Sequence, residues 1–368
     1  MAPKPGRALL HLAAAVDQRT AYDAGSHVEL ARLAESGGLD FVTLDDPFAR
    51  PGPDALAVLS RVAPATRRVG LVPTVTTTHT EPFHVRAAVA TLDRVSRGRA
   101  GWRLAVPATE GEARPFGRRP PSPVDALWRE AGGVAELWRD GEVADVAARL
   151  WDSRADDAET RDVATGPLAD RDDPRRVDPT GSAFSAGDPS TVPRPPQGHP
   201  VRVVDATEGH VRATAARYAD VVLVRAVNPG QAGAVRDELR AAAPAFGRHP
   251  DELRVLASLA VDLGDGEHAA EPGHGGGGPR QTARGPLYRG GPVGLAELVA
   301  AWHAGGGVDG FHFTPVQPRR DLERLVNGTV ALLQHRGLFR TFYPGSTLRE
   351  HLGLAGPVNR YAPTGGTP

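Results

Sequence analysis

The chain has 368 residues, of which 40% are hydrophobic and 24% are charged, and its formal net charge is −1. This length is typical of a barrel with insertions, and the apolar fraction is enough for a sizeable core. A nearly neutral chain has no basic field for nucleic acid or an anionic membrane, and the absence of cysteine excludes disulfides and cysteine metal sites.

The amino-terminal stretch MAPKPGRALLHLAAAV has an apolar run behind two positive charges, which a signal peptide would also show. The run is short, contains His11 and leads through Asp17 into a helix, so we expect a first strand instead. We find no run of about 18 apolar residues, the length that a membrane span needs. The lack of cysteine fits a cytoplasmic protein.

Strand-like and helix-like segments alternate along the chain. Strands are expected at 8–16, 41–46, 69–76, 100–106, 201–206, 221–226, 253–263 and 310–316. Helices are expected at 27–38, 54–66, 82–98, 209–219, 231–243, 294–306 and 321–338. Continuous apolar strands between amphipathic helices indicate a parallel sheet.

Eight strands of this kind predict an α/β fold of the (β/α)8 TIM barrel type, with insertions, formed by residues 1–368 as a single domain. A doubly wound open sheet is the alternative. Its nucleotide-binding fingerprint would follow the first strand, and AAAVDQRTAYDAG contains no GxGxxG pattern.

Three excursions interrupt the alternation, and a tail follows it. Residues 107–124 are rich in Pro and Arg, residues 153–199 are acidic and then Pro-rich, and residues 264–292 contain the run GHGGGG. A helix-like stretch at 125–152 lies between the first two. We expect surface insertions here, with a flexible tip at the glycine run, and a carboxyl-terminal tail at 339–368.

Polar residues gather at the expected carboxyl ends of the strands, where barrel enzymes carry their active sites. They are Asp45, Asp46, Thr74 to His79, Trp102, Arg103, Asp205 to Thr207, Arg225 and His312 to Thr314. Such a set suits a neutral, hydrogen-bonding, partly planar ligand. A metal site would need clustered His and carboxylate residues at the short, regular spacings typical of metal ligands, so no metal site is predicted.

Most of these residues also have a purely structural interpretation. The Asp45-Asp46 pair could cap a helix, and threonine suits strand ends without any ligand. His79 and His84 could lie on the surface or cap a helix. Arg103 is harder to explain in this way, because a charge on a barrel strand needs a partner or a ligand.

Several blocks of the sequence resemble the bacterial luciferase-like flavin-dependent monooxygenases, in their nitrilotriacetate and dibenzothiophene-sulfone monooxygenase branch. The blocks are HVELARLAESGGLDFVTLDD, VGLVPTVTTTHTEPFHVRAAVATLDRVSRGRAGW, ARLWDSRADDAETRDVATG and RGLFRTFYPGSTLREHLGL. The resemblance implies a barrel that binds reduced FMN, supplied by a separate NAD(P)H-dependent flavin reductase. Reaction with O2 would then give a C4a-(hydro)peroxyflavin that oxygenates a small organic substrate.

Two other functions stay open. The chain could be an F420- or FMN-dependent oxidoreductase of the same barrel family, or a non-catalytic relative that has lost productive flavin binding. The family also forms dimers, so a homodimer is a further expectation.

The resemblance also implies cofactor-binding residues. Asp46 matches a flavin-contacting aspartate, Thr74 and Thr76 lie in the segment that supplies a flavin-contacting hydroxyl, and Thr207 stands in the turn that helps to hold the FMN phosphate. Trp102 belongs to the same predicted flavin site, on the fourth strand. For the catalytic acid or base, strand-end position ranks His79 first, then His11, then His312.

The chain departs from the branch at two places. The branch has Gly-Trp-Asn on the fourth strand, and this chain has Arg103 in place of the asparagine. The branch also has a His and a Tyr near the flavin phosphate, whereas GRRPPSPVDALWREAGG contains neither. Arg118, Arg119 or Arg129 could supply positive charge instead, and Arg103 is either a divergence or a new phosphate clamp.

Overall fold

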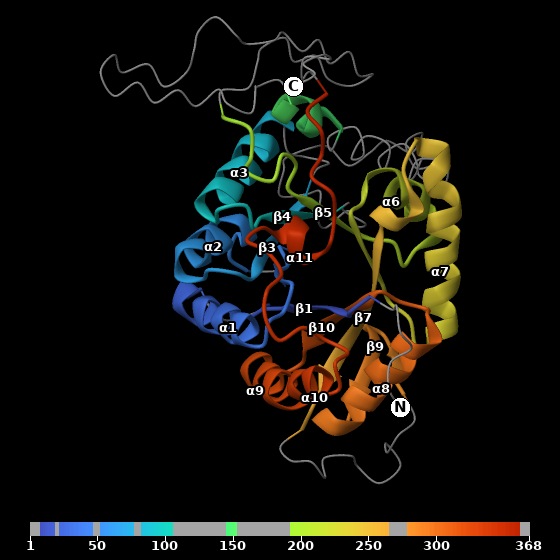
Figure 1. Ribbon diagram of the computed structural model, residues 1–368. Coiled ribbons are helices and arrows are strands. Elements are labelled where there is room, and N and C mark those ends of the chain that lie inside the picture. Colours follow the sequence, from blue (N-terminus) through green and yellow to red (C-terminus); the bar gives the residue numbers. More distant parts are fainter. Residues whose placement is uncertain are drawn as a thin grey trace, which may run out of the picture.

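The computed structural model describes residues 8–18, 22–46, 52–76, 82–105, 145–152, 192–264 and 278–360. Eight parallel strands form a closed barrel in the order β10-β1-β2-β3-β4-β5-β6-β7, and β10 pairs with β7 to complete it (Figure 1). The predicted (β/α)8 TIM barrel is therefore confirmed. Its strands are β1 (His11–Ala15), β2 (Phe41–Leu44), β3 (Gly70–Thr76), β4 (Gly101–Ala105), β5 (Val201–Asp205), β6 (Val221–Val224), β7 (Arg254–Asp262) and β10 (Gly310–Pro315).

Helices surround the barrel, and some of them begin at a side-chain cap. Asp23 accepts hydrogen bonds from the amides of Gly25 and Ser26, and Asn228 does the same for Gln231. A π-helical turn joins the last two of the covering helices. The helices are α1 (Ala24–Ser36), α2 (Ala55–Val62), α3 (Pro82–Val95), α6 (Arg212–Tyr218), α7 (Pro229–Ala242), α8 (Pro292–Gly305), α9 (Pro318–Arg324) and α10 (Ala331–His335), and residues 145–152 are also helical.

Strand side chains alternate between the barrel interior and the helices. Ala13, Phe41, Val72 and Leu256 belong to an inner cluster, whereas their chain neighbours pack in the larger cluster under the helices. This period of two follows from the pleat of a strand. It decides which residue of each strand end can face a ligand in the barrel.

A short helix, α11 (Leu348–His351), closes the amino-terminal end of the barrel, and Figure 1 shows it lying across the strands. Leu348, Leu352 and Leu354 join the inner cluster. A Cβ atom on Gly70 would lie 2.6 Å from a methyl carbon of Leu348. Glycine at the start of β3 therefore makes room for Leu348. We call α11, together with Leu352 and Leu354, the plug of the barrel.

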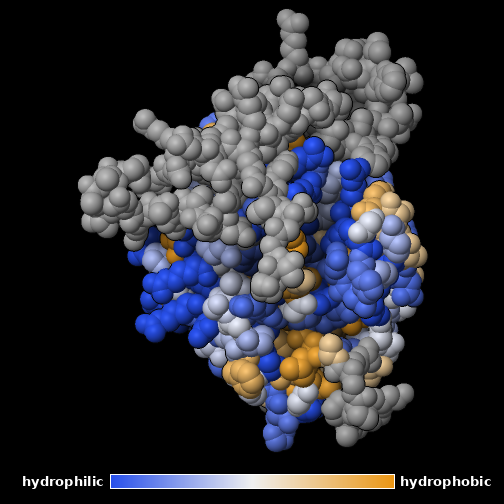
Figure 2. Space-filling view, turned by 45° about the horizontal axis from the view of Figure 1, so that its top comes forward, coloured by the Kyte–Doolittle hydropathy of each residue, from blue (hydrophilic) through white to orange (hydrophobic). Residues whose placement is uncertain are grey.

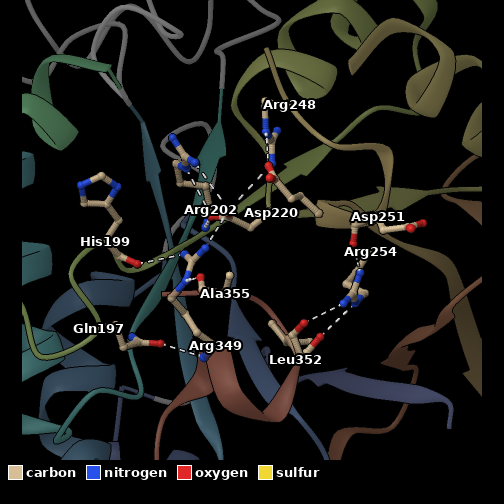
Figure 3. Close-up of polar contacts among 12 residues, drawn as sticks. Gln197, His199, Arg202, Asp220, Arg248, Asp251, Arg254, Arg349, Leu352 and Ala355 are labelled. Carbon is tan, nitrogen blue, oxygen red and sulfur yellow. Dashed lines mark hydrogen bonds and ion pairs between the residues drawn. The ribbon is translucent and has the colours of Figure 1, made fainter. Parts of the chain in front are cut away.

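Arginines hold this carboxyl-terminal segment in place (Figure 3). Arg349 Nη1 donates to the His199 carbonyl at 3.1 Å. Arg254 donates through Nε to the Leu352 carbonyl and through Nη2 to the Gly353 carbonyl, both at 2.9 Å. The forked guanidinium can satisfy several carbonyls at once, and these are the groups that a tail without regular structure leaves unpaired.

The excursion predicted at 264–292 contains a hairpin that the sequence analysis did not predict. It consists of β8 (Arg280–Thr282) and β9 (Gly285–Arg289), and β9 pairs with the end of β7. Gly285 has a φ of +103° and its α-carbon faces the Arg225 stem, where a Cβ atom would lie 3.1 Å from Cδ. The hairpin therefore lies beside the carboxyl end of β6.

The described surface seen in Figure 2 is mainly hydrophilic, and hydrophobic residues gather in the lower part of that view. The large hydrophobic side chains that are exposed come from several separate elements. Within the described ranges, no helix is both long enough and apolar enough to cross a membrane.

Candidate active site

A cavity of about 1350 Å³ lies at the carboxyl ends of the barrel strands. This is larger than the roughly 300–1,000 Å³ of most ligand pockets. The walls come from seven barrel strands or the residues just after them, together with the β8–β9 hairpin and the start of α9. Among the lining residues are Asp17, Gln18, Asp45, Arg103, Asp205, Arg225, Ser258, Arg284, His312 and Thr314.

Arg103 lines the cavity and has an acidic partner there. Its Nη2 atom lies 2.5 Å from Asp45 Oδ1, and the two side chains are 22% and 39% exposed. The amide of Asp45 in turn donates to Asp17 Oδ1 at 2.7 Å. The charge on the fourth strand is thus paired, and the cavity wall carries a guanidinium and a carboxylate side by side.

His312 is buried in the cavity wall between two hydroxyl groups. Its Nε2 lies 2.9 Å from Thr43 Oγ1, and its Nδ1 lies 3.2 Å from Ser258 Oγ. Burial, with a further contribution from the charge of Arg103, lowers the pKa of His312 to about 3. The imidazole is therefore neutral near pH 7, and it can donate or accept a hydrogen bond but not act as a cationic acid.

The end of β5 is occupied by contacts within the protein. Thr207 donates its hydroxyl hydrogen to Asp205 Oδ1 at 2.6 Å and accepts from the Arg225 amide at 3.0 Å. Arg225 Nη2 lies 3.4 Å from Asp205 Oδ2. Asp205 and Arg225 line the cavity, while Thr207 lies behind them. A phosphate contact through Thr207 remains a prediction.

Two of the predicted site residues lie elsewhere. His11 is the first residue of β1, pairs in register with Gly310, and lies 3.2 Å from Asp40 at the amino-terminal end of the barrel. Trp102 points outward, is completely buried, and meets Trp151 edge-on at a ring distance of 6.5 Å. The expectation that they reach the mouth was wrong, because strand position and pleat direct them away from it.

The remaining predicted residues lie near the cavity rather than in its described wall. Asp45, not Asp46, faces the cavity, and Asp46 accepts a hydrogen bond from the Ala55 amide at 3.3 Å. Burial and two neighbouring aspartates raise the pKa of Asp46. Thr74 and Thr76 are 3% and 5% exposed on the inward face of β3. The predicted catalytic residue His79 lies outside the described residues.

Three residues of the site were missed from sequence. Thr43 and Ser258 hold His312, and Gln18 lines the cavity. Gln18 Nε2 and Thr74 Oγ1 are buried without a hydrogen-bond partner among the described residues. Buried polar groups are normally paired, so these two atoms are available for hydrogen bonds with a polar ligand.

The model of the family described as Luciferase-like monooxygenase matches residues 8–277. The chain belongs to this family. It is 29% identical to the N-acetyl-S-(2-succino)cysteine monooxygenase of Bacillus subtilis (strain 168), over 91% of this chain and 90% of that protein. It is 30% identical to nitrilotriacetate monooxygenase component A of Aminobacter aminovorans, over 93% of this chain and 92% of that protein. The resemblance seen in the sequence is confirmed, and the chain is a member of an oxidoreductase family.

Among solved structures, the fold is similar to that of EDTA monooxygenase from Chelativorans sp. BNC1, with a TM-score of 0.77. The sequences are 22% identical, and the match covers 95% of this chain and 99% of the other. At this level of identity the match concerns the fold alone.

Proposed function

We propose that this protein is a flavin-dependent monooxygenase that uses reduced FMN and O2 to oxygenate a small organic substrate. The observation that carries the proposal is the cavity at the carboxyl ends of the strands. Gln18 Nε2 in its wall and Thr74 Oγ1 near it have no hydrogen-bond partner among the described residues. The edge of an isoalloxazine ring carries both hydrogen-bond donors and acceptors. Gln18 Nε2 can donate a hydrogen bond to an acceptor on that edge, and Thr74 Oγ1 can either donate or accept one.

The residues of the cavity fit this cofactor. When bound, reduced FMN would supply the electrons that activate O2, so that one oxygen atom enters the substrate and the other leaves as water. The chain would orient the ring through Gln18, Thr74 and the paired Arg103 and Asp45. The cavity wall would keep bulk water away from the reacting groups.

Among the described histidines, His312 is our candidate for contact with the reacting groups, and His79 stays a prediction. His312 lines the cavity, and its neutral imidazole between Thr43 and Ser258 can accept or donate a hydrogen bond. It would act as a hydrogen-bonding group of fixed orientation, since its low pKa keeps it unprotonated at neutral pH.

A separate NAD(P)H-dependent reductase would supply the reduced flavin. The name of the Aminobacter relative, component A, fits a system of more than one component. The predicted cytoplasmic location and a homodimer remain part of this proposal.

An anaerobic titration of the purified protein with reduced FMN tests the function. We expect saturable binding, and after addition of O2 a slower return of the oxidised flavin spectrum than for free reduced FMN. A parallel titration with F420 tests the alternative cofactor. Binding of F420 but not FMN would contradict the monooxygenase proposal, and binding of neither would favour a non-catalytic relative.

A further inference from the structure

Arg86 on α3 is a buried cation without a counter-charge in the described part of the chain. The residue has 0% exposure, and its Nε, Nη1 and Nη2 atoms all lack a hydrogen-bond partner. Among the described residues no other arginine has all three nitrogens in this state. Arg99, by comparison, is also buried and donates to the carbonyls of Ser96 and Val69, among others.

An arginine in this position is costly unless something pairs with it. Burial lowers the pKa of Arg86 to about 10, and no carboxylate among the described residues offsets that effect. The guanidinium carbon lies 4.3 Å from the centre of the Phe83 ring, and a stacked ring offers attraction but accepts no strong hydrogen bond. The stack therefore leaves the donors of the guanidinium unsatisfied.

Arg86 is held near the amino-terminal end of α3, a helix of 14 residues. Side chains on a helix slant toward its amino terminus, and the contact with Phe83 shows that Arg86 does so here. Trp151 Nε1 donates to the Arg86 carbonyl at 3.2 Å and fixes the backbone. Phe83 is 42% exposed, so this end of the helix reaches solvent one turn away from the buried charge.

We propose that Arg86 and the first turn of α3 bind an oxyanion, either a phosphate or a carboxylate. The first turn of a helix has backbone N–H groups without intrahelical partners and a partial positive charge. A guanidinium beside it adds the fork of donors that oxyanions prefer. Since α3 follows β3, this turn lies on the same side of the barrel as the cavity.

Two sources of the anion share this chemistry. One is the terminal phosphate of the flavin, which rests on the proposed function and would replace the missing His and Tyr contacts of the branch. The other is an acidic group on the organic substrate. Arg86 is not among the residues that line the cavity, so either anion would reach it from the rim, past Phe83.

Inorganic phosphate tests the anion site without flavin. The full-length protein is compared with Arg86→Met, with Arg86→Lys and with Arg94→Met, a control at an exposed arginine on the same helix. We expect phosphate, relative to chloride at equal ionic strength, to raise the unfolding temperature of the wild type and of Arg94→Met. Arg86→Met should lose this response and Arg86→Lys should keep part of it.

The same data separate an anion site from a structural role. Without phosphate, Arg86→Met should be at least as stable as the wild type, because it removes an unpaired buried charge. A wild type without a phosphate response, or an Arg86→Met protein that retains the full response, overturns the proposal. If Arg86→Met does not fold, Arg86→Lys decides the question. A phosphate response in Arg86→Lys as large as that of the wild type would also overturn the proposal, since lysine lacks the forked donors of the guanidinium group.

A comparison of FMN with riboflavin, which lacks the phosphate, identifies the source. If the flavin phosphate is the anion, Arg86→Met should lower the affinity for FMN by about tenfold or more and leave that for riboflavin unchanged. If both affinities are unchanged while the phosphate response is lost, the site serves the substrate. A wild type that binds neither flavin contradicts the proposed function, and the phosphate response then still decides the anion site.

Discussion

At the scale of single residues, the cavity depends on polar side chains that each face inward at the end of a strand. His312 on β10 pairs in register with Ala13 on β1, and it reaches past that strand to Thr43 on β2. A small residue on β1 leaves room for this contact. The imidazole is thereby enclosed by hydroxyl groups that can complement either neutral tautomer.

His312 should make the stability of the protein sensitive to acid. Its pKa is lowered in the folded state, so the unfolded chain takes up the proton first. Its contribution is therefore complete above about pH 6.5, the ordinary pKa of histidine, and is lost as the pH falls toward 3, by at most about 1.4 kcal/mol per pH unit. We expect His312→Gln to lose less stability than the wild type between pH 7 and pH 5 in urea unfolding.

His249→Gln is the matched control, because that histidine is 69% exposed. It should follow the wild type at both pH values. An equal loss in His312→Gln and in the wild type would mean that His312 is not held neutral by the fold.

Arg103 should help to bind the reduced cofactor. Replacement by asparagine, the residue of the related branch, would leave Asp45 unpaired in the cavity wall. We expect Arg103→Asn to weaken reduced-FMN binding by about tenfold in an anaerobic fluorescence titration, the range for loss of a charged hydrogen bond. Arg289→Gln serves as the control, since Arg289 pairs with Asp262 outside the described cavity wall. Unchanged or tighter binding in Arg103→Asn would identify Arg103 as a neutral divergence.

At the scale of elements, the two ends of the barrel have different tasks. The carboxyl ends of the strands open into the cavity through polar side chains, whereas an apolar inner cluster that includes Leu348 of α11 fills the amino-terminal end. Side chains of the strands fill the interior of such a barrel, and here leucines of the tail add to them. A helix of only four residues is sufficient, because Leu348 at its start and Leu352 and Leu354 after it join the inner cluster.

The plug should contribute strongly to stability. Leu348 is fully buried and contacts β3 at Gly70. We expect Leu348→Ala to lower the free energy of unfolding by about 2–5 kcal/mol, the range for a large-to-small change in a core. Leu9→Ala, at a residue that is 48% exposed, should change it far less. Urea unfolding measures both, and similar losses in the two variants would mean that α11 is not a plug.

At the scale of the whole molecule, buried carboxylates connect the tail to distant parts of the barrel. Asp220, just before β6, lies 3.2 Å from Arg202 Nε and 3.4 Å from Arg349 Nη2, and 4.0 Å from Arg248 Nη2 (Figure 3). Burial alone would raise the pKa of Asp220, but the three guanidinium groups hold it well below its ordinary value. One carboxylate thus joins β5, β6 and the tail.

Loss of this carboxylate should destabilise the whole protein. Asp220→Asn would leave Arg202 and Arg349 without their carboxylate partner and would bring no negative charge to Arg248 beyond that of Glu252. We expect a loss of about 3–5 kcal/mol in the free energy of unfolding. The exposed Asp237→Asn is the control. Both are compared by urea unfolding at pH 7. A loss below about 1 kcal/mol in Asp220→Asn would show that the cluster is only weakly coupled to folding.

The positions of the eight strands were predictable because each is a short apolar run between turn signals, and the structure places them within a few residues of the expected ranges. The hairpin at 280–289 was not predictable in the same way. Its first strand, β8, has only three residues. They include Arg280 and Gln281, are all exposed, and show no apolar alternation. It forms because the end of β7 offers an edge for pairing.

The candidate site was predictable only in part. Strand ends indicated Arg103 and His312, which do line the cavity. The same reasoning placed His11 and Trp102 there, because position along a strand was considered without the direction of the strand or its pleat. Gln18, which lies just after β1, carried no signal in the sequence that set it apart from other loop residues.

The sequence by itself determined the family, the alternation of strands and helices, and the end of the barrel at which polar residues gather. These depend on local patterns and on the right-handed connection of parallel strands, which the chain carries in its own order. Only the tertiary structure decided which polar residues meet, that Asp45 rather than Asp46 faces the cavity, and that Arg86 is buried without a hydrogen-bond partner among the described residues. Such facts depend on side chains from distant parts of the chain, and their distances arise only when the barrel closes.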